Sequence, residues 1–272
     1  QTHDRGEMRL GFSGEAAGFE WHFDYNLSQS VYGLANGFGD NNLNSYGVSY
    51  EMDNGLKLGI GRGIAKFSRE TYIDTADQLG ILPTQSAIQT ALYTNAISAC
   101  YEADQFRGCF QLHDSAPAIG NFTDDTGEAV QAMTARGEFL VMGNWDAMSS
   151  FSSSAGAEST LVLGLGWGDE DSFDGMTYDL SYYMDAMCVS VAMYDVFDGT
   201  YEATTVNASY WLMDDGQAYV KYEDIDGVDD ATFSLGWNQY YGDNVRANVT
   251  FEDNLGTGGD DYAVVGGIQF TF

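Results

Sequence analysis

F-E-W-H-F-D-Y-N-L, residues Phe19 to Leu27, is a stretch in which every odd-numbered residue is large and apolar and every even-numbered residue is polar or charged, up to the final leucine. Because successive side chains of a strand point to opposite faces, this stretch predicts a β-strand with one apolar and one polar face. The pattern returns along almost the whole chain, down to I-Q-F-T-F at residues 268–272. The fold therefore depends on which face of each strand meets water.

Strand segments can be marked along the whole chain. They lie near residues 7–14, 18–27, 43–52, 56–65, 91–102, 106–113, 132–142, 145–152, 159–167, 175–185, 187–195, 201–212, 217–224, 231–240, 245–252 and 261–272. Helical periodicity is nearly absent, so the sequence predicts an all-β fold. We interpret the 272 residues as one domain, 1–272.

The composition narrows the class of protein. A formal charge of −31, from 41 acidic and 10 basic residues, argues against nucleic-acid binding, because the phosphate backbone would be repelled. No apolar run approaches the roughly 18 residues that a membrane helix requires. The chain has 33 glycines and 2 prolines, which favours closely spaced strands joined by tight turns. A soluble acidic protein is the alternative, but it gives no reason to place aromatic residues opposite the charges.

A soluble β-sandwich would alternate as well, and three features favour a membrane barrel instead. The segments run about ten residues, the length that a tilted strand needs to cross a bilayer. Aromatic residues recur at strand ends, where they would mark the membrane interfaces. The last strand ends on Phe272. We expect a transmembrane antiparallel β-barrel with a water-filled lumen, of sixteen strands, with fourteen as the alternative.

The connections come in two sizes and orient such a barrel. Short turns would face the periplasm, and the long connections 28–42, 66–90 and 114–131 would face outside. The long connections of the two halves of the chain fall at opposite ends, so one element between about 143 and 175 must be assigned wrongly. The chain begins at Gln1 without a basic and apolar leader, so we expect an exported form whose signal peptide has been removed.

Strand parity indicates which charged residues face the lumen. Six of the basic residues have inward parity: Arg9, Lys57, Arg107, Arg136, Lys221 and Arg246. These bases could set a field in the pore, or they could simply neutralise inward acids such as Glu20, Asp24 and Glu252. Runs of acids at 169–171, 229–230 and 260–261 offer the oxygen ligands that Ca²⁺ prefers, although solvated turn carboxylates are the simpler interpretation. Glu20, His22 and Asp24 share one strand face, which is compatible with a metal site but commonplace in a wet barrel.

Two of the three cysteines are placed informatively. If Asp104 and Gln105 form a two-residue turn, the register brings Cys100 directly opposite Cys109 on the lumen face. An oxidising compartment would permit a disulfide there, while reduced neighbours or a longer turn are the alternatives. Cys188 would remain single. Motifs for catalysis are missing, because G-I-G-R-G at 59–63 lies within a strand and no serine sits in a G-x-S-x-G elbow, so we expect no enzyme.

The run S-Y-G-V-S-Y-E-M-D-N-G-L-K-L-G-I-G-R, Ser45 to Arg62, resembles the hairpin that precedes the third loop of the trimeric general diffusion porins of bacterial outer membranes. The run from Met8 to Tyr25 resembles the hairpin before it, and Phe272 matches the C-terminal aromatic residue of that family. The resemblance covers essentially the full length and rests on pattern and position.

This resemblance implies a sixteen-stranded barrel, a homotrimer in contact with outer-membrane lipid and lipopolysaccharide, and a third external loop folded into the lumen. Here that loop is residues 66–90, and it brings Glu70, Asp74 and Asp77 opposite the basic wall. The implied function is passive diffusion of ions and small hydrophilic solutes, with no required cofactor. The acidic excess predicts mild cation selectivity. A closed barrel that serves as an anchor or adhesin is the alternative.

Overall fold

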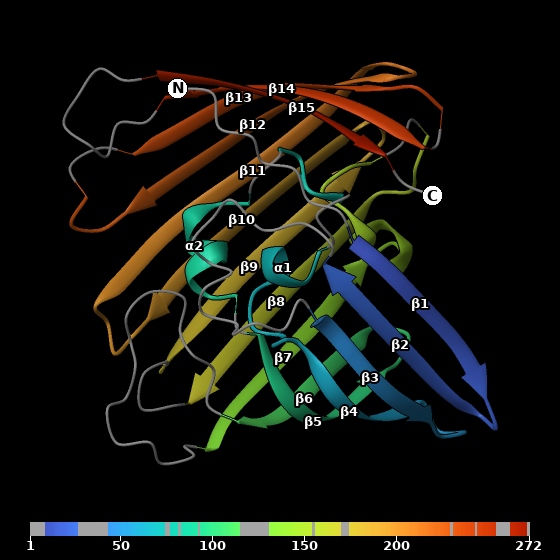
Figure 1. Ribbon diagram of the computed structural model, residues 1–272. Helices are drawn as coiled ribbons and strands as arrows, with labels where there is room; N and C mark the ends of the chain where they lie inside the picture. Colours follow the sequence, from blue (N-terminus) through green and yellow to red (C-terminus); the bar gives the residue numbers. More distant parts are fainter. Residues whose placement is uncertain are drawn as a thin grey trace.

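A computed structural model describes residues 9–26, 43–73, 77–80, 83–91, 93–114, 131–153, 156–169, 174–228, 231–242, 244–253 and 262–270. These residues form one antiparallel sheet of fifteen strands, in which each strand pairs with its neighbours in the sequence (Figure 1). The strands are β1 Arg9–Ala16, β2 Phe19–Asn26, β3 Leu43–Glu51, β4 Leu56–Ile64, β5 Tyr93–Glu102, β6 Phe106–Asp114, β7 Gln131–Met142, β8 Thr160–Asp169, β9 Gly175–Met184, β10 Met187–Val196, β11 Tyr201–Met213, β12 Gly216–Ile225, β13 Thr232–Tyr240, β14 Val245–Asp253 and β15 Tyr262–Phe270.

Short helical turns accompany the sheet, and those that lie wholly within the described residues include α1 (Arg69–Tyr72), α2 (Gln85–Gln89) and the 3₁₀ turn η3 (Trp145–Ser149). The sheet curls around, so that α1 and α2 lie inside its curve (Figure 1). None of the helices in the described ranges has the length and hydropathy that crossing a bilayer requires. The all-β prediction is confirmed.

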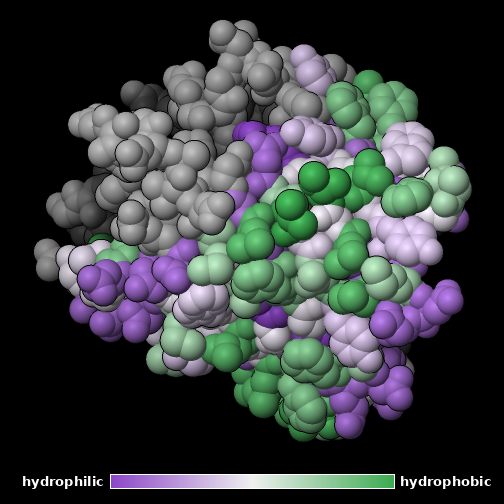
Figure 2. Space-filling model, turned by 90° about the horizontal axis from the view of Figure 1, so that it is seen from below, coloured by the Kyte–Doolittle hydropathy of each residue, from purple (hydrophilic) through white to green (hydrophobic). Residues whose placement is uncertain are grey.

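The outer face of the sheet is apolar and exposed. Val48, Ile60 and Ile97 form one cross-strand row, and Ile60 keeps 63% of its surface exposed. Figure 2 shows apolar side chains gathered in a band on one side of the molecule, with hydrophilic side chains at its ends. A continuous apolar surface of this kind is not stable against water. It needs an apolar environment such as lipid.

The inner face of the same strands is polar, and its covering differs along the sheet. On β1 to β3 the inward residues Glu15, Glu20 and Glu51 are exposed. On β9 and β11 inward residues such as Thr177 and Thr205 are buried. The interior is therefore filled next to β7–β13 and open next to β1–β5.

One predicted strand is wrong. Residues 145–152 form η3 and a following extended stretch, because the side chain of Asn144 accepts a hydrogen bond from the Asp146 backbone and turns the chain at once (3.1 Å). With this segment counted as a connection, the long connections after β2, β4, β6 and β14 all leave the same end of the sheet. This correction removes the conflict in orientation that the sequence had shown.

The expected number of strands changes for the same reason. The described residues form fifteen strands, neither sixteen nor fourteen, and β1 and β15 stand at the two edges of the described sheet without pairing with each other. The remaining predicted strands coincide with observed ones to within a few residues.

Candidate functional site

The connection between β4 and β5, residues 65–92, enters the interior over β8. The side chain of Phe67 is fully buried, and its carbonyl oxygen accepts hydrogen bonds from Arg136 Nη1 (3.1 Å) and Thr177 Oγ1 (3.1 Å). A Cβ placed on Gly166 of β8 would overlap that carbonyl oxygen. The loop can therefore dock this closely only because residue 166 is a glycine.

Glu70 lies in α1, where its contacts hold the loop in place, and its side chain does not face solvent. Its carboxylate accepts from the backbone (2.7 Å) and hydroxyl (2.8 Å) of Thr84 and from Asn207 Nδ2 (3.3 Å), and it lies 3.7 Å from Lys221 Nζ. Only 4% of Glu70 is exposed. The expected cluster of loop carboxylates facing a distant basic wall is thus replaced, at Glu70, by a buried contact pair with Lys221.

Glu223 of β12 caps α2 from the wall. Its carboxylate accepts hydrogen bonds from the backbone N–H groups of Gln85 (2.8 Å) and Ser86 (2.6 Å) and from the Ser86 hydroxyl (2.5 Å). These are the donors that the first turn of a helix leaves unsatisfied. Sequence reasoning missed Glu223, although its inward parity placed it on the correct face.

Two arginines of the wall are held in a buried charged cluster. Arg136 pairs with Glu138 (2.8 Å) and Asp179 (2.7 Å), and Arg107 pairs with the other oxygen of Glu138. The hydroxyl of Tyr72 in α1 donates to Glu138 as well, and burial raises the pKa of Tyr72, which keeps this donor protonated. The two positive charges are matched by two negative ones, so the charges of this cluster balance and its contacts hold the loop.

The far part of the loop is fastened by two more wall residues. Arg246 Nη1 donates to the Gln78 carbonyl (2.6 Å), and Asn238 Nδ2 donates to the Leu79 carbonyl (2.9 Å). Asp77 is exposed and lines a cavity of about 690 Å³ that Glu102 and Arg107 also line. Of the other predicted residues, Asp74 and the side chain of Arg9 lie outside the described residues.

A second segment enters the interior from the opposite end, where the short turns lie. Residues 144–153, here called the inner segment, follow β7 and lead towards β8. Ser209 Oγ donates to the Phe151 carbonyl (2.8 Å), and Trp211 Nε1 (2.9 Å) and Gln217 Nε2 (2.8 Å) both donate to Ser152 Oγ. One sign of this segment was visible in the sequence, namely the conflict in orientation between residues 143 and 175.

Lys57 is a predicted basic residue that faces the open part of the interior. It forms an ion pair with Glu20 across β3, and both side chains keep substantial exposure, 39% and 53%. Glu15, Glu51 and Glu102 are exposed on the same inner face of β1, β3 and β5. The open wall therefore carries more acids than bases, whereas Arg136, Lys221 and Arg246 are buried beside the loop.

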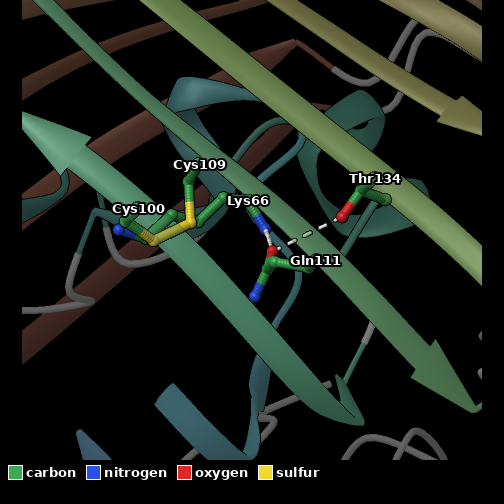
Figure 3. Close-up of a disulfide and its surroundings, with 5 residues drawn as sticks. All are labelled: Lys66, Cys100, Cys109, Gln111 and Thr134. Atoms are coloured by element: carbon green, nitrogen blue, oxygen red, sulfur yellow. Dashed lines mark hydrogen bonds between the residues drawn. A yellow bond between two sulfur atoms is a disulfide. The ribbon is translucent and has the colours of Figure 1, made fainter. Parts of the chain in front are cut away.

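Cys100 and Cys109 lie directly opposite each other on β5 and β6, in the predicted register, and a disulfide joins them with an S–S distance of 2.00 Å. Figure 3 shows this bond beside Gln111, whose side-chain oxygen accepts from the Lys66 backbone (2.6 Å) where the loop begins. Cys188 is free and buried.

The candidate metal sites receive no support from the described residues. No group of three metal-ligating side chains occurs among them, and this includes Glu20, His22 and Asp24. Of the acidic runs, Asp169 is described and exposed. The other acidic residues of these runs, at 170–171, 229–230 and 260–261, lie outside the described residues. Calcium binding there therefore stays a prediction.

No family model matches this sequence, and no curated protein matches it. Solved structures do match. The anion-selective porin from Comamonas acidovorans is 15% identical with a TM-score of 0.64, over 100% of this chain and 91% of that one. A triple mutant of Rhodopseudomonas blastica porin is 13% identical with a TM-score of 0.61, over 97% and 89%. The chain has the fold of bacterial porins, and the predicted resemblance is confirmed at that level.

Proposed function

We propose that this protein is a porin of the bacterial outer membrane, a homotrimer that forms water-filled channels for passive diffusion of ions and small hydrophilic solutes. One observation carries the proposal: on β1 and β2 the outer side chains are apolar and exposed, while inner ones such as Glu15 and Glu20 are polar and also exposed. A single sheet with two exposed faces of opposite polarity suits lipid and lipopolysaccharide outside and water inside.

The interior leaves a passage on one side only. The loop 65–92 and the inner segment occupy the space next to β7–β13, where inward side chains such as Ser181 and Asn238 are fully buried. Solutes would pass along the exposed inner face of β1–β5. The proposal needs no chemical step, and it assigns no catalytic residue.

We propose mild cation selectivity for this passage. The exposed acids Glu15, Glu51 and Glu102 line it, whereas Lys57 is paired with Glu20 and the partly exposed Arg107 is paired with Glu138. Negative potential in a narrow aqueous passage raises the local concentration of cations. The Comamonas porin shares the fold and is described as anion-selective, so the fold does not set the sign of selectivity. The residues that face the passage must set it.

Planar-bilayer recordings test both parts. Stepwise conductance with a reversal potential that favours K⁺ over Cl⁻ is expected, and the combined change Glu15→Gln, Glu51→Gln and Glu102→Gln should lower that preference. The matched control neutralises three exposed acids with outward parity at strand ends: Asp195, Glu202 and Asp224. An equal effect of both sets would contradict an assignment to the passage.

The alternative is a closed barrel that acts as an anchor or adhesin, and the filled half of the interior is the observation that favours it. A protein that shows heat-modifiable migration in detergent, and so is folded, but gives no conductance steps would support this alternative. Cross-linking in detergent should give a trimer band if the homotrimer is correct.

A further inference from the structure

The wall behind the inner segment is built to receive it. On β1 to β3, where the inner face is open, the inward side chains are polar. By contrast, Leu140 and Val162 point inward from β7 and β8 and are buried. They pack with Met148 of η3. Three residues later Phe151 joins a second apolar cluster with Ile73, Leu79 and Tyr219. Apolar residues would not be stable on a wall that faced water, so the inner segment is part of the folded interior.

The inner segment differs from the other connections at its end of the sheet. The turns after β1, β9 and β11 each have two residues between their strands, whereas residues 143–159 separate β7 from β8. A hairpin needs only two to five residues to connect two antiparallel strands. The additional residues of this connection allow it to extend inward, towards the loop 65–92.

Arg69 joins the two inward segments. Its guanidinium donates to the Ser150 carbonyl (2.7 Å) and the Met148 carbonyl (3.4 Å) of the inner segment, and its Cζ lies 4.4 Å from the centre of the Phe151 ring. The other guanidinium bonds reach the wall, at Ser181 Oγ (2.9 Å) and the Tyr183 hydroxyl. Arg69 is 2% exposed.

The chemistry of these contacts matters. The hydrogen bonds that Arg69 makes among the described residues all go to neutral oxygen atoms, although a buried cation is normally matched by a carboxylate. Its position therefore depends on the inner segment being in place to supply two carbonyl groups. Removing either partner leaves buried polar groups unsatisfied on the other.

We propose that the inner segment is a second pore-occluding element and that Arg69 latches it to the loop, so that the two segments together close the half of the lumen next to β7–β13. The inference rests on the proposed channel function and adds to it the element that sets the width of the passage. Conductance would then be limited from both ends of the barrel, by the loop from one side and by the inner segment from the other.

Two variants test the latch by conductance. Arg69→Met keeps a long apolar side chain against Phe151 but removes every donor, and deletion of residues 145–158 leaves a four-residue connection between the paired residues Met142 and Leu161. Each should raise single-channel conductance, by about twofold for the deletion. Arg246→Met is the matched control, because it removes an interior cation whose described bond goes to the loop carbonyl of Gln78. It should raise conductance less than Arg69→Met.

Cys188 supplies a second readout that does not depend on ion flow. It is fully buried in the cluster that Met148 closes, while the other two cysteines form a disulfide. In folded protein without reductant, maleimide should label Cys188 slowly in the native chain and in Arg246→Met. Labelling should be at least about tenfold faster in Arg69→Met and in the deletion.

The outcomes separate the two proposals. If both folded variants conduct like the native chain, or if native Cys188 reacts as fast as in the deletion, the latch is overturned. Heat-modifiable migration establishes that each variant is folded. A native chain that does not conduct would contradict the channel function, and the labelling rates would still show whether Arg69 holds the inner segment in place.

Discussion

The carbonyl oxygen of Phe67 lies directly over Gly166, so that the loop rests on the wall at a point where no side chain separates them. Replacement of Gly166 by alanine should lift the start of the loop, at a cost of about 1–3 kcal/mol in the free energy of unfolding, as is usual for overpacking. Displacement would expose Arg69, which is buried in the native structure, to trypsin. Mass spectrometry of a timed digest should show cleavage after this residue.

Gly63 provides the control for this prediction, because a Cβ there would meet nothing within 4 Å. Gly63→Ala should digest like the native protein. Equal resistance of Gly166→Ala would mean that the loop does not rest on β8.

Glu223→Ala should weaken the docking of α2. The substitution removes the acceptor of two backbone N–H groups and the Ser86 hydroxyl, and the loss of such a cap costs about 1–2 kcal/mol. The midpoint of denaturant unfolding in micelles, followed by tryptophan fluorescence, measures this cost. Glu252→Ala, at a partly exposed inward acid of β14, should shift the midpoint less.

Substitutions of Glu70 and Asp77 should have different effects on stability and on ion selectivity, although both residues belong to the loop. Glu70→Gln weakens buried hydrogen bonds and the pair with Lys221, so it should lower the free energy of unfolding by about 1 kcal/mol with little change in ion selectivity. Asp77→Asn, at an exposed position, should lower cation preference and leave stability nearly unchanged. Reversal potentials and unfolding midpoints distinguish them. If neutralising Glu70, Asp74 and Asp77 together left the ion selectivity unchanged, the carboxylates of the loop would not set that selectivity.

The Cys100–Cys109 disulfide predicts a simple thiol count. Denatured, unreduced protein should contain one free thiol, that of Cys188, and reduced protein should contain three. A Cys188→Ser variant should then give none and two. Three thiols before reduction would show that the lumen-facing pair is not bonded.

Calcium binding at the acidic runs 169–171, 229–230 and 260–261 should raise the thermal unfolding midpoint when Ca²⁺ is added and lower it when chelator is added, because a ligand of the folded state stabilises that state. Mg²⁺ at the same concentration controls for general screening of charge. A midpoint that responds to neither would leave these acids as solvated turn residues.

Local rules were enough for part of the site. The pairing of Cys100 with Cys109 follows from a two-residue turn and the period of two along each strand, and the observed register agrees. The same period placed Arg136 and Lys221 on the inner face. It could not tell whether water or protein would meet them, because that depends on segments that are distant in sequence.

The segment 145–152 shows where local rules failed. Its residues can be aligned with a strand pattern, but Met148 and Phe151 gain more from packing against Leu140 and Tyr219 than exposed strand positions would offer them. Burial against partners from five strands and from the loop 65–92 decided the conformation. A single sequence shows such partners only indirectly, here as a conflict in orientation.

By itself the sequence determined a sheet with one apolar and one polar face, its order and its register, because alternation and turn length act between near neighbours in the chain. Tertiary structure alone decided that the interior is filled on one side, that Glu70 is an anchor and that Arg69 spans two segments entering from opposite ends. These features depend on which groups meet across the interior, where burial, charge pairing and unsatisfied donors are settled between residues far apart in the sequence.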